Sequence, residues 1–512
     1  MQFRFVIPLI GLWLGLGIWT ASAQTSPEKP EFIILQLNDV YEIGTLEGGK
    51  SGGLARVASL RDSLRRECPH VITVLAGDFI SPSLIGTLKD ETGQAIRGRQ
   101  MVEVMNALGV DYVAFGNHEF DYAEEALQAA LDASTFTWLG GNVRRKTSTG
   151  IQVFHKNTPK GPEPLADYVI HALPRPNGDT LHLAFLAYTL PFNRAKYVEY
   201  DPAAWEKLKQ DYQQAKEKAA YVLLISHQDI ADDEKLAQQM PQLPLIMGGH
   251  DHVNMRKTVG NVLITKADAN AKTVFVHRFY REANRQSFTL QSTLAPIDAH
   301  WQAHPLVQEV VDKWEQIAEK SMLALGYQPK AAVIQIENNL DGRESTIRYQ
   351  PTLLGQIIAK ASQAAGSSAD LGLLNSGSIR IDDQLTGTIT QTDILRILPY
   401  GGALHQMDCS GDILTQLLNT GLETNHGQGG YLQIWPFPEK KRGKWYLMNQ
   451  KIAPRKIYKV VLPAFVAEGK EKNLEFLQAV PSQELDTQRT LGVPNDVRQV
   501  LIHYLQKYGL NY

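Results

Sequence analysis

Short apolar runs alternate with amphipathic segments along the N-terminal half of the chain. Six runs have the length of a strand and are bounded by glycine or polar residues, which indicates buried β-strands. They span residues 32–37, 71–76, 112–115, 181–188, 221–225 and 243–247. Between them, the segment 54–64 keeps its apolar residues at helical spacing, and the segment 101–108 ends at Gly109, as suits a helix C-terminus. This alternation predicts a layered α/β domain.

The pattern changes after about residue 260. Strand-length runs at 261–265, 274–280 and 287–294 follow without helices between them, which predicts an antiparallel end to the domain. One long helix joining two halves is then predicted from apolar residues at helical spacing, namely Leu306, Val310, Trp314 and Ile317.

The C-terminal part has a composition of its own from about residue 327 onward. Helical periods are expected at 351–364 and 413–422, strands at 371–374 and 458–462, and a glycine-rich loop at 427–430. A chain of 512 residues is too long for one hydrophobic core, so two or three domains are expected.

The first residues indicate a targeting signal for export. Arg4 precedes an apolar stretch over residues 5–19, and Ala21-Ser22-Ala23 supplies the small residues that suit signal peptidase. We interpret residues 1–23 as a signal peptide and expect export to the periplasm or the extracellular space. The alternative is an uncleaved anchor, but about 15 apolar residues fall short of the roughly 20 that a spanning helix requires. A membrane span in the mature chain is therefore not expected.

The charge of the chain bears on its partners, and its two cysteines bear on disulfide formation. A net charge of −3 and a pI near 6.5 exclude the strongly basic footprint of a nucleic-acid-binding protein. The one compact basic block, residues 439–444, is interpreted as a solvated loop. Cys68 and Cys409 are expected to be free buried thiols in different domains, with a disulfide in an oxidising compartment as the alternative.

Polar clusters follow the predicted strands directly. They are Asn38-Asp39, Gly77-Asp78, Gly116-Asn117-His118-Glu119, Phe120-Asp121, Ser226-His227 and Gly249-His250-Asp251-His252. Aspartate, asparagine and histidine delivered together at strand ends are what a two-metal hydrolytic site needs, because these groups are hard or borderline ligands for divalent cations.

The order and content of these clusters resemble the calcineurin-like metallophosphoesterases, and the whole chain resembles their 5'-nucleotidase and UDP-sugar hydrolase branch. The resemblance implies a four-layer αββα sandwich over residues 31–300 and a linker helix over residues 301–326. A smaller C-terminal α/β domain of the 5'-nucleotidase type would bind the substrate with residues 327–512. Two divalent metal ions, such as zinc, manganese, iron or cobalt, are implied as cofactors.

The resemblance also implies a role for individual residues. Metal one would be held by Asp39 and His252, metal two by Asn117, His227 and His250, and both by the bridging Asp78. His118 would donate a proton or hydrogen bond to the leaving oxygen. Asp121 would orient His118 and keep it charged, because a neighbouring carboxylate raises a histidine pKa.

The C-terminal motifs imply the substrate contacts. Asn375 and Arg380 belong to the segment 375–380, where the arginine would grip the phosphate through its planar charged fork. A structural ion pair is the alternative for Arg380. Tyr431 occupies the place of an aromatic residue that stacks on one face of the base.

Two departures from the family pattern affect the site. The family's first motif is Asp-x-His, but Tyr41 stands in place of the histidine, and a phenol is a poorer ligand at neutral pH unless the metal deprotonates it. The first site is then weaker, holds a water at that place, or selects a harder or oxophilic metal. The family's Gly-Gly-Asp-Gly loop is replaced around Lys470 to Glu475, and Phe476 is too far along to be assigned to the base pocket.

These observations predict a secreted, metal-dependent phosphoric ester hydrolase, with 5'-nucleotidase activity as the first expectation. Alternatives are a broader phosphomonoesterase, a cyclic-nucleotide phosphodiesterase or a nucleotide-sugar hydrolase. A binding protein that has lost turnover is the alternative from another class, favoured by Tyr41 and the altered loop and opposed by the retained His118 and Asp121. The expected partner is a small-molecule phosphate ester, and the oligomeric state is left open.

Overall fold

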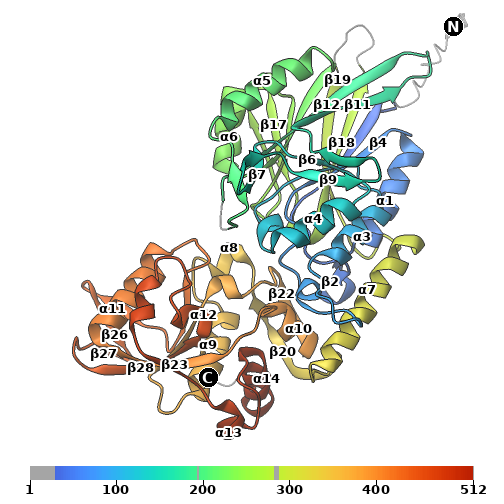
Figure 1. Cartoon of the computed structure of the whole chain (residues 1–512). Coiled ribbons are helices and arrows are strands. Elements are labelled where there is room, and N and C mark those ends of the chain that lie inside the picture. The colour runs from blue at the N-terminus through green and yellow to red at the C-terminus, as the bar shows by residue number, and fades with distance from the viewer. Residues whose placement is uncertain (1–28, 193–194, 282–287, 511–512) are drawn as a thin grey trace, which may run out of the picture.

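The computed structural model describes residues 29–192, 195–281 and 288–510, which form two domains (Figure 1). The signal peptide predicted for residues 1–23 lies outside these described residues. Strands and helices alternate through the first domain, and the C-terminal domain follows after one long helix.

The first predicted strand lies inside a six-stranded sheet. Its strand order is β19 (Phe288–Pro296), β18 (Thr273–Arg281), β1 (Phe32–Leu37), β4 (Val71–Ala76), β5 (Tyr112–Ala114) and β6 (Thr137–Leu139). The strands β1, β4, β5 and β6 are parallel, whereas β18 is antiparallel to both β1 and β19. The predicted bounds of β1 and β4 are confirmed, and the antiparallel end of the domain is confirmed for β18 and β19, whereas the strand predicted at 261–265 lies in the other sheet and runs parallel to its neighbour on one side.

A second six-stranded sheet packs against the first. Its order is β11 (Tyr168–Pro174), β12 (Thr180–Thr189), β14 (Tyr221–His227), β15 (Leu245–Gly249), β17 (Val262–Lys266) and β16 (Met255–Val259). Phe32 and Val74 of the first sheet share one buried apolar cluster with Phe185, Ile225 and Met247 of the second. Helices cover the outer faces as well, so the central strands are buried on both faces and consist of nearly continuous apolar runs.

Helices cover the two outer faces. The first sheet is covered by α1 (Leu54–Glu67), α3 (Arg99–Leu108) and α4 (Glu124–Ala133), and the second by α5 (Ala204–Lys216) and α6 (Ile230–Gln239). The predicted four-layer αββα sandwich is therefore confirmed. The helix α3 ends at Gly109, whose φ of 75° is the left-handed conformation expected of a helix C-cap.

A group of short strands between residues 143 and 200 was not predicted. It comprises β7 (Val143–Thr147), β8 (Gly150–Gln152), β9 (His155–Thr158), β10 (Gly161–Pro164) and β13 (Val198–Tyr200). These strands are short and mostly exposed, so they lack the apolar alternation by which strands are recognised.

The predicted linker helix exists as α7 (Pro305–Ala324). Val307, Val311 and Trp314 are buried, whereas Leu306 is 70% exposed and Val310 and Ile317 are only partly buried. The indole nitrogen of Trp314 donates a hydrogen bond to Glu103 of α3, which fixes the rotation of α7 against the first domain. The helix is thus part of the helical layer as well as a connection (Figure 1).

The second domain is built on a five-stranded sheet. Its order is β24 (Leu432–Trp435), β21 (Leu371–Asn375), β28 (Ile457–Pro463), β23 (Leu404–Ser410) and β29 (Ser482–Glu484). A separate pair consists of β20 (Ala332–Asp341) and β22 (Gln384–Thr390). The main helices are α9 (Leu353–Ala365), α10 (Gln391–Ile397), α11 (Gly411–Asn419) and α14 (Val497–Tyr508). The predicted smaller α/β domain is therefore confirmed.

Two further expectations concern cysteines and the membrane. Cys68 and Cys409 are both buried and free, as predicted. Within the described ranges, the search for a helix long and apolar enough to cross a membrane finds none.

The burial along α7 generates a stability prediction. Met322 is 5% exposed and packs into the core, whereas its neighbour Leu323 is 46% exposed. Met322→Ala should therefore lower the free energy of unfolding by about 2–5 kcal/mol, and Leu323→Ala should change it by less than about 0.5 kcal/mol. Urea unfolding of both variants measures the difference. Equal losses would show that α7 faces the domain with another side.

Candidate metal centre and active site

The predicted ligands come from strand ends of both sheets. Asp39 follows β1, Asp78 follows β4, Asn117 follows β5, His227 ends β14, and His250 and His252 follow β15. The carboxyl ends of these parallel strands meet at one edge of the sandwich, where open α/β sheets bind their ligands. The fold thus gathers six polar side chains that are far apart in the sequence.

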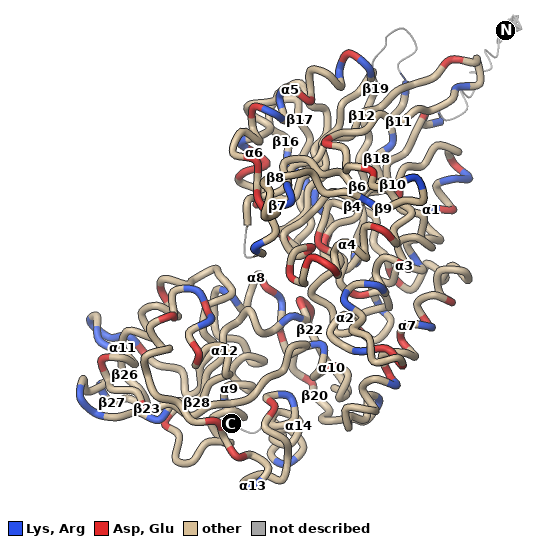
Figure 2. The backbone as a smooth tube through the Cα atoms, in the orientation of Figure 1, with Lys and Arg blue, Asp and Glu red and all other residues tan. Residues whose placement is uncertain are grey.

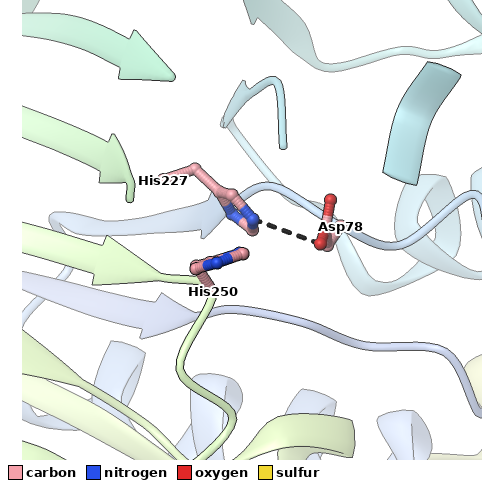
Figure 3. Close-up of side chains that lie close together, drawn as sticks. All are labelled: Asp78, His227 and His250. Carbon is pink, nitrogen blue, oxygen red and sulfur yellow. Dashed lines mark ion pairs between the residues drawn. The ribbon is translucent and has the colours of Figure 1, made fainter. Parts of the chain in front are cut away.

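Four of the six form one compact group. The ligand atoms of Asp78, His227 and His250 lie within 4.8 Å of one another (Figure 3). Asp78 Oδ2 lies 3.1 Å from His227 Nε2, and Asn117 Oδ1 lies 3.2 Å from His227 Nε2 and 3.1 Å from His250 Nδ1. His227 Nδ1 donates to the Ala76 carbonyl at 2.7 Å, which leaves Nε2 free to bind a cation.

A second group forms around Tyr41. Its buried hydroxyl lies 3.0 Å from His252 Nε2, 3.3 Å from Asp78 Oδ2 and 3.4 Å from Asp39 Oδ1, and His252 Nε2 lies 3.4 Å from Asp39 Oδ1. Two donors that are each about 2.1 Å from a cation lie roughly 3.0–3.4 Å apart when the angle between their bonds is 90–109°. These distances therefore fit donors around one cation, and the Tyr41 hydroxyl lies among them.

The electrostatics of both groups favour bound cations. Burial opposes ionisation of Asp78, but the charges of His227 and His118 outweigh it and lower the pKa of this carboxyl. Burial, and then the charges of Asp78 and Asp39, raise the pKa of Tyr41 well above its usual value. A divalent cation acts in the opposite direction on a phenol. The centre therefore holds two buried carboxylates whose charge a cation would offset.

The backbone at the ligands is strained. The φ angle is 52° at Asp39, 57° at Asp78, 81° at His250 and 55° at His252. Non-glycine residues rarely adopt this left-handed region, and each such residue costs about 1–3 kcal/mol, which the surrounding structure must offset. Strain at four of six predicted ligands supports the assignment of this edge as the functional site.

Glu119 holds the first two loops together and was not predicted as a site residue. Its wholly buried carboxylate accepts backbone N–H groups of Gly116 at 2.6 Å, Asp78 at 2.8 Å and Phe79 at 2.8 Å. Burial, followed by the charge of Asp78, raises the pKa of Glu119 to about 7. Gly116 is required here, because a Cβ atom would lie 2.1 Å from Asp78 Oδ1. The only signal in the sequence was the place of Glu119 inside the polar cluster.

Lys266 holds the other two loops. It is fully buried, and its Nζ lies 2.8 Å from Asp233 Oδ2 and 2.5 Å from Asp251 Oδ2. The same nitrogen donates to the carbonyl oxygens of Gln228 at 2.5 Å and Gly249 at 2.8 Å. It therefore ties the loop after β14 to the loop that carries His250 and His252. A lone lysine at a strand end carries no pattern, so sequence reasoning missed it.

His118 and Asp121 lie beside the metal ligands. His118 Nδ1 is 2.7 Å from Asp121 Oδ2, which also accepts the Ser81 hydroxyl at 2.9 Å. The backbone N–H of His118 donates to Asp78 Oδ1 at 2.7 Å. Burial opposes the charged form of His118, but the charges of Asp121 and Asp78 prevail and raise its pKa. The imidazole can therefore be held as a cation next to the ligand cluster.

Arg380 brings a positive charge from the second domain to this centre. Burial lowers the pKa of Arg380, but nearby groups, including Glu344 and Asp121, outweigh that effect and raise it. Its buried Nε has no hydrogen-bond partner among the described residues. The guanidinium therefore keeps a donor for a ligand.

Asn375 and Tyr431 are already engaged inside the second domain. Asn375 donates to Glu471 Oε2 at 2.7 Å and accepts the Ser378 hydroxyl at 2.5 Å. Tyr431 is only 4% exposed, and its ring packs edge-to-face with the ring of His426, with 5.8 Å between the two ring centroids. Phe476 packs, partly buried, against the apolar cluster that also contains Tyr431.

An exposed aromatic residue near Tyr431 was missed. Tyr349 is 50% exposed and packs edge-to-face with His426, with 5.2 Å between the two ring centroids. It lies far from the glycine-rich loop in sequence, so no motif drew attention to it.

Comparisons with known proteins agree with this arrangement. A family model described as calcineurin-like phosphoesterase matches residues 32–254, and one described as 5'-nucleotidase, C-terminal domain, matches residues 332–479. The 5'-nucleotidase of Bos taurus is 24% identical over 523 residues, which cover 90% of this chain and 86% of that protein. Protein UshA of Salmonella pullorum is 24% identical over 499 residues, covering 88% and 87% of the two chains.

A solved structure shows the same fold. The 5'-nucleotidase precursor from Thermus thermophilus superposes with a TM-score of 0.69 at 19% identity, covering 93% of this chain and 96% of that one. The matched models span both domains, including every predicted metal ligand and Arg380. The chain therefore belongs to the calcineurin-like phosphoesterases that carry a 5'-nucleotidase C-terminal domain, and is a metal-dependent phosphoric ester hydrolase.

Proposed function

We propose that this protein is a two-metal phosphomonoesterase that releases phosphate from nucleoside 5'-monophosphates. The observation that carries the proposal is the meeting of two groups of metal-binding donors with the His118–Asp121 pair and with Arg380 of the second domain. Export is also proposed, on the N-terminal segment of the sequence alone.

Two cations would occupy the two donor groups. Asp39, His252 and Tyr41 would hold metal one, the four-residue group around His227 would hold metal two, and Asp78 would bridge them. Divalent cations in such a site offset the negative charge of a phosphoryl group and polarise it as Lewis acids. The phenol of Tyr41 favours a harder metal such as manganese or iron over zinc.

Arg380 would bind the phosphate. A planar guanidinium can make two parallel hydrogen bonds to phosphate oxygens, and its charge would offset the charge of the transition state. The structural ion pair considered as the alternative has no support, because no described carboxylate lies within ion-pair distance of Arg380. The unpartnered Nε supports a ligand-binding role instead.

His118 would assist the leaving group. When Nδ1 donates to Asp121, the proton on Nε2 of the charged ring is available to the leaving oxygen. Ser81 donates to the same carboxylate oxygen and thereby helps to fix its orientation. The pair is thus oriented before the substrate arrives.

A broader phosphomonoesterase is the second candidate, and the state of the base-binding residues favours it. Tyr431 has almost no free face, and Asn375 is bonded to Glu471 of the loop that departs from the family pattern. One-sided base stacking is worth about 1–3 kcal/mol at most. We therefore expect only weak discrimination between bases.

A hydrolysis screen tests the proposal. Nucleoside monophosphates, cyclic nucleotides, nucleotide sugars and simple phosphomonoesters would each be assayed with manganese, zinc, cobalt and magnesium. Turnover of different nucleoside 5'-monophosphates should vary by less than about tenfold, or roughly 1.4 kcal/mol, with measurable activity on simple phosphomonoesters. Absence of phosphate release under every condition would contradict an enzymatic role, and strong preference for one base would contradict the weak discrimination.

His118→Ala tests the role of His118 in the same screen. It should lower turnover by roughly 10² to 10⁴ while the metal content stays as in the wild type, since His118 contacts Asp78 through its backbone and not through its ring. Loss of a metal ion from this variant would show that His118 is a ligand.

Substitutions of Tyr41 test the first metal site. Because the hydroxyl lies among three other donors, Tyr41→Phe should weaken one zinc equivalent of the apo-protein, and Tyr41→His should tighten it by restoring an imidazole that binds zinc without prior ionisation. Calorimetric titration with zinc measures both. Isotherms identical to the wild type for both variants would mean that residue 41 does not bind the metal.

A further inference from the structure

One predicted ligand of metal one is supported from the other domain. His252 Nδ1 lies 2.9 Å from Asp382 Oδ2 and 3.8 Å from Glu344 Oε2. Asp382 belongs to the loop between β21 and β22, and Glu344 begins the short helix α8 (Glu344–Ile347), so both acidic residues come from the C-terminal domain. The nitrogen on the opposite side of the ring, Nε2, faces Asp39 and Tyr41 of the first domain.

This arrangement gives the imidazole a defined orientation. A carboxylate can only accept a hydrogen bond, so Asp382 places a proton on Nδ1 and leaves Nε2 for the cation. Metal-binding histidines generally have such a partner, which fixes the ring and makes it a stronger ligand. Asp382 is therefore suited to prepare His252 for metal one.

In the described part of the chain, the contacts that support the metal-two histidines come from the first domain. His227 donates its outer N–H to Ala76 O, and the His250 loop is fastened by Lys266, both within the first domain. The two sites thus differ in how their histidines are supported.

Asp382 is itself firmly held at the domain interface. Its Oδ1 accepts the backbone N–H of Glu344 at 2.9 Å, and its carbonyl accepts Lys272 Nζ of the first domain at 3.2 Å. Its φ of 41° is a strained conformation, which such contacts must maintain. Lys272 also lies 3.3 Å from Asp383.

Other charged pairs cross the interface. Arg396 of α10 lies 3.2 Å from Glu42, the residue after Tyr41. Figure 2 shows acidic and basic positions gathered where α8 and β22 face the first domain. The contact between the domains near metal one is therefore polar and specific in its pairing.

We propose that Asp382 is a positioning residue through which the C-terminal domain completes the first metal site. Binding of the first cation is then coupled to the docking of the second domain, and by reciprocity that cation stabilises the docked arrangement. Metal two binds without this coupling. The inference rests on the proposed assignment of His252 to metal one.

Metal titration tests this role separately from turnover. The full-length apo-protein would be titrated with manganese by calorimetry as the wild type, Asp382→Ala, Asp382→Asn and Asp383→Asn. Asp382→Ala should weaken one equivalent by about 10–100-fold and leave the other unchanged. Asp382→Asn keeps an oxygen that can accept the Nδ1 proton, so its loss should be smaller. Asp383→Asn separates the direct contact from docking, because it weakens the cross-domain pair with Lys272 but keeps the bond between Asp382 and His252, so its loss of the first equivalent should be smaller than that of Asp382→Ala.

A second measurement follows the coupling itself. Amide hydrogen exchange in residues 344–347 should slow when manganese is added to the wild type and should not respond in Asp382→Ala. Wild-type affinity of both equivalents in Asp382→Ala would overturn the proposal, and so would equal weakening of both. His252→Ala binding both equivalents normally would overturn the ligand assignment. A negative substrate screen combined with the selective loss in Asp382→Ala would reject the proposed activity and leave this inference standing.

Discussion

Two buried carboxylates, Asp39 and Asp78, meet at the edge where the two sheets of the first domain end, and the surrounding structure serves to hold them there in their charged form. Both are in left-handed backbone conformations, and both contact imidazoles. Glu119 adds a third buried acid that binds the backbone of the Asp78 loop. So much negative charge away from water is costly unless cations offset it. The site therefore carries two costs, a strained backbone and buried negative charge. Metal binding offsets the buried charge.

The two domains contribute different parts of the chemistry. In the proposed mechanism, the first domain supplies the donors for both cations and the His118–Asp121 pair, at strand ends fastened by Glu119 and Lys266. The second domain would supply Arg380 for the phosphate and Asp382 for the orientation of His252. Because these two residues are separated by a single position in one loop, phosphate binding and the support of metal one would come from the same segment of the second domain. Neither domain alone carries the complete set.

Much of the fold and the location of the candidate site could be predicted from the sequence. Strands such as β1 and β4 are buried on both faces, so their apolar runs and the polar residues at their ends are visible locally. The residues that support the ligands were missed because their roles depend on contacts across long stretches of chain, as with Lys266 and Asp382. The apolar spacing predicts the helix α7 but not which side of it is buried, because apolar residues flank the buried stripe and the hydrogen bond from Trp314 to Glu103 selects the rotation. The burial of Tyr431 depends on its packing inside the second domain and against His426, which no motif encodes.

We propose that Asp78 bridges two cations, and elemental analysis of purified protein tests this role most directly. Wild-type protein, reconstituted with manganese and freed of excess ion, should retain two equivalents per chain. Asp78→Ala should retain neither at full occupancy and should lose metal-dependent hydrolysis, because each cation would lose a shared ligand and the charge that binds it. Asp78→Ala with two tightly held equivalents and unchanged turnover would contradict the account.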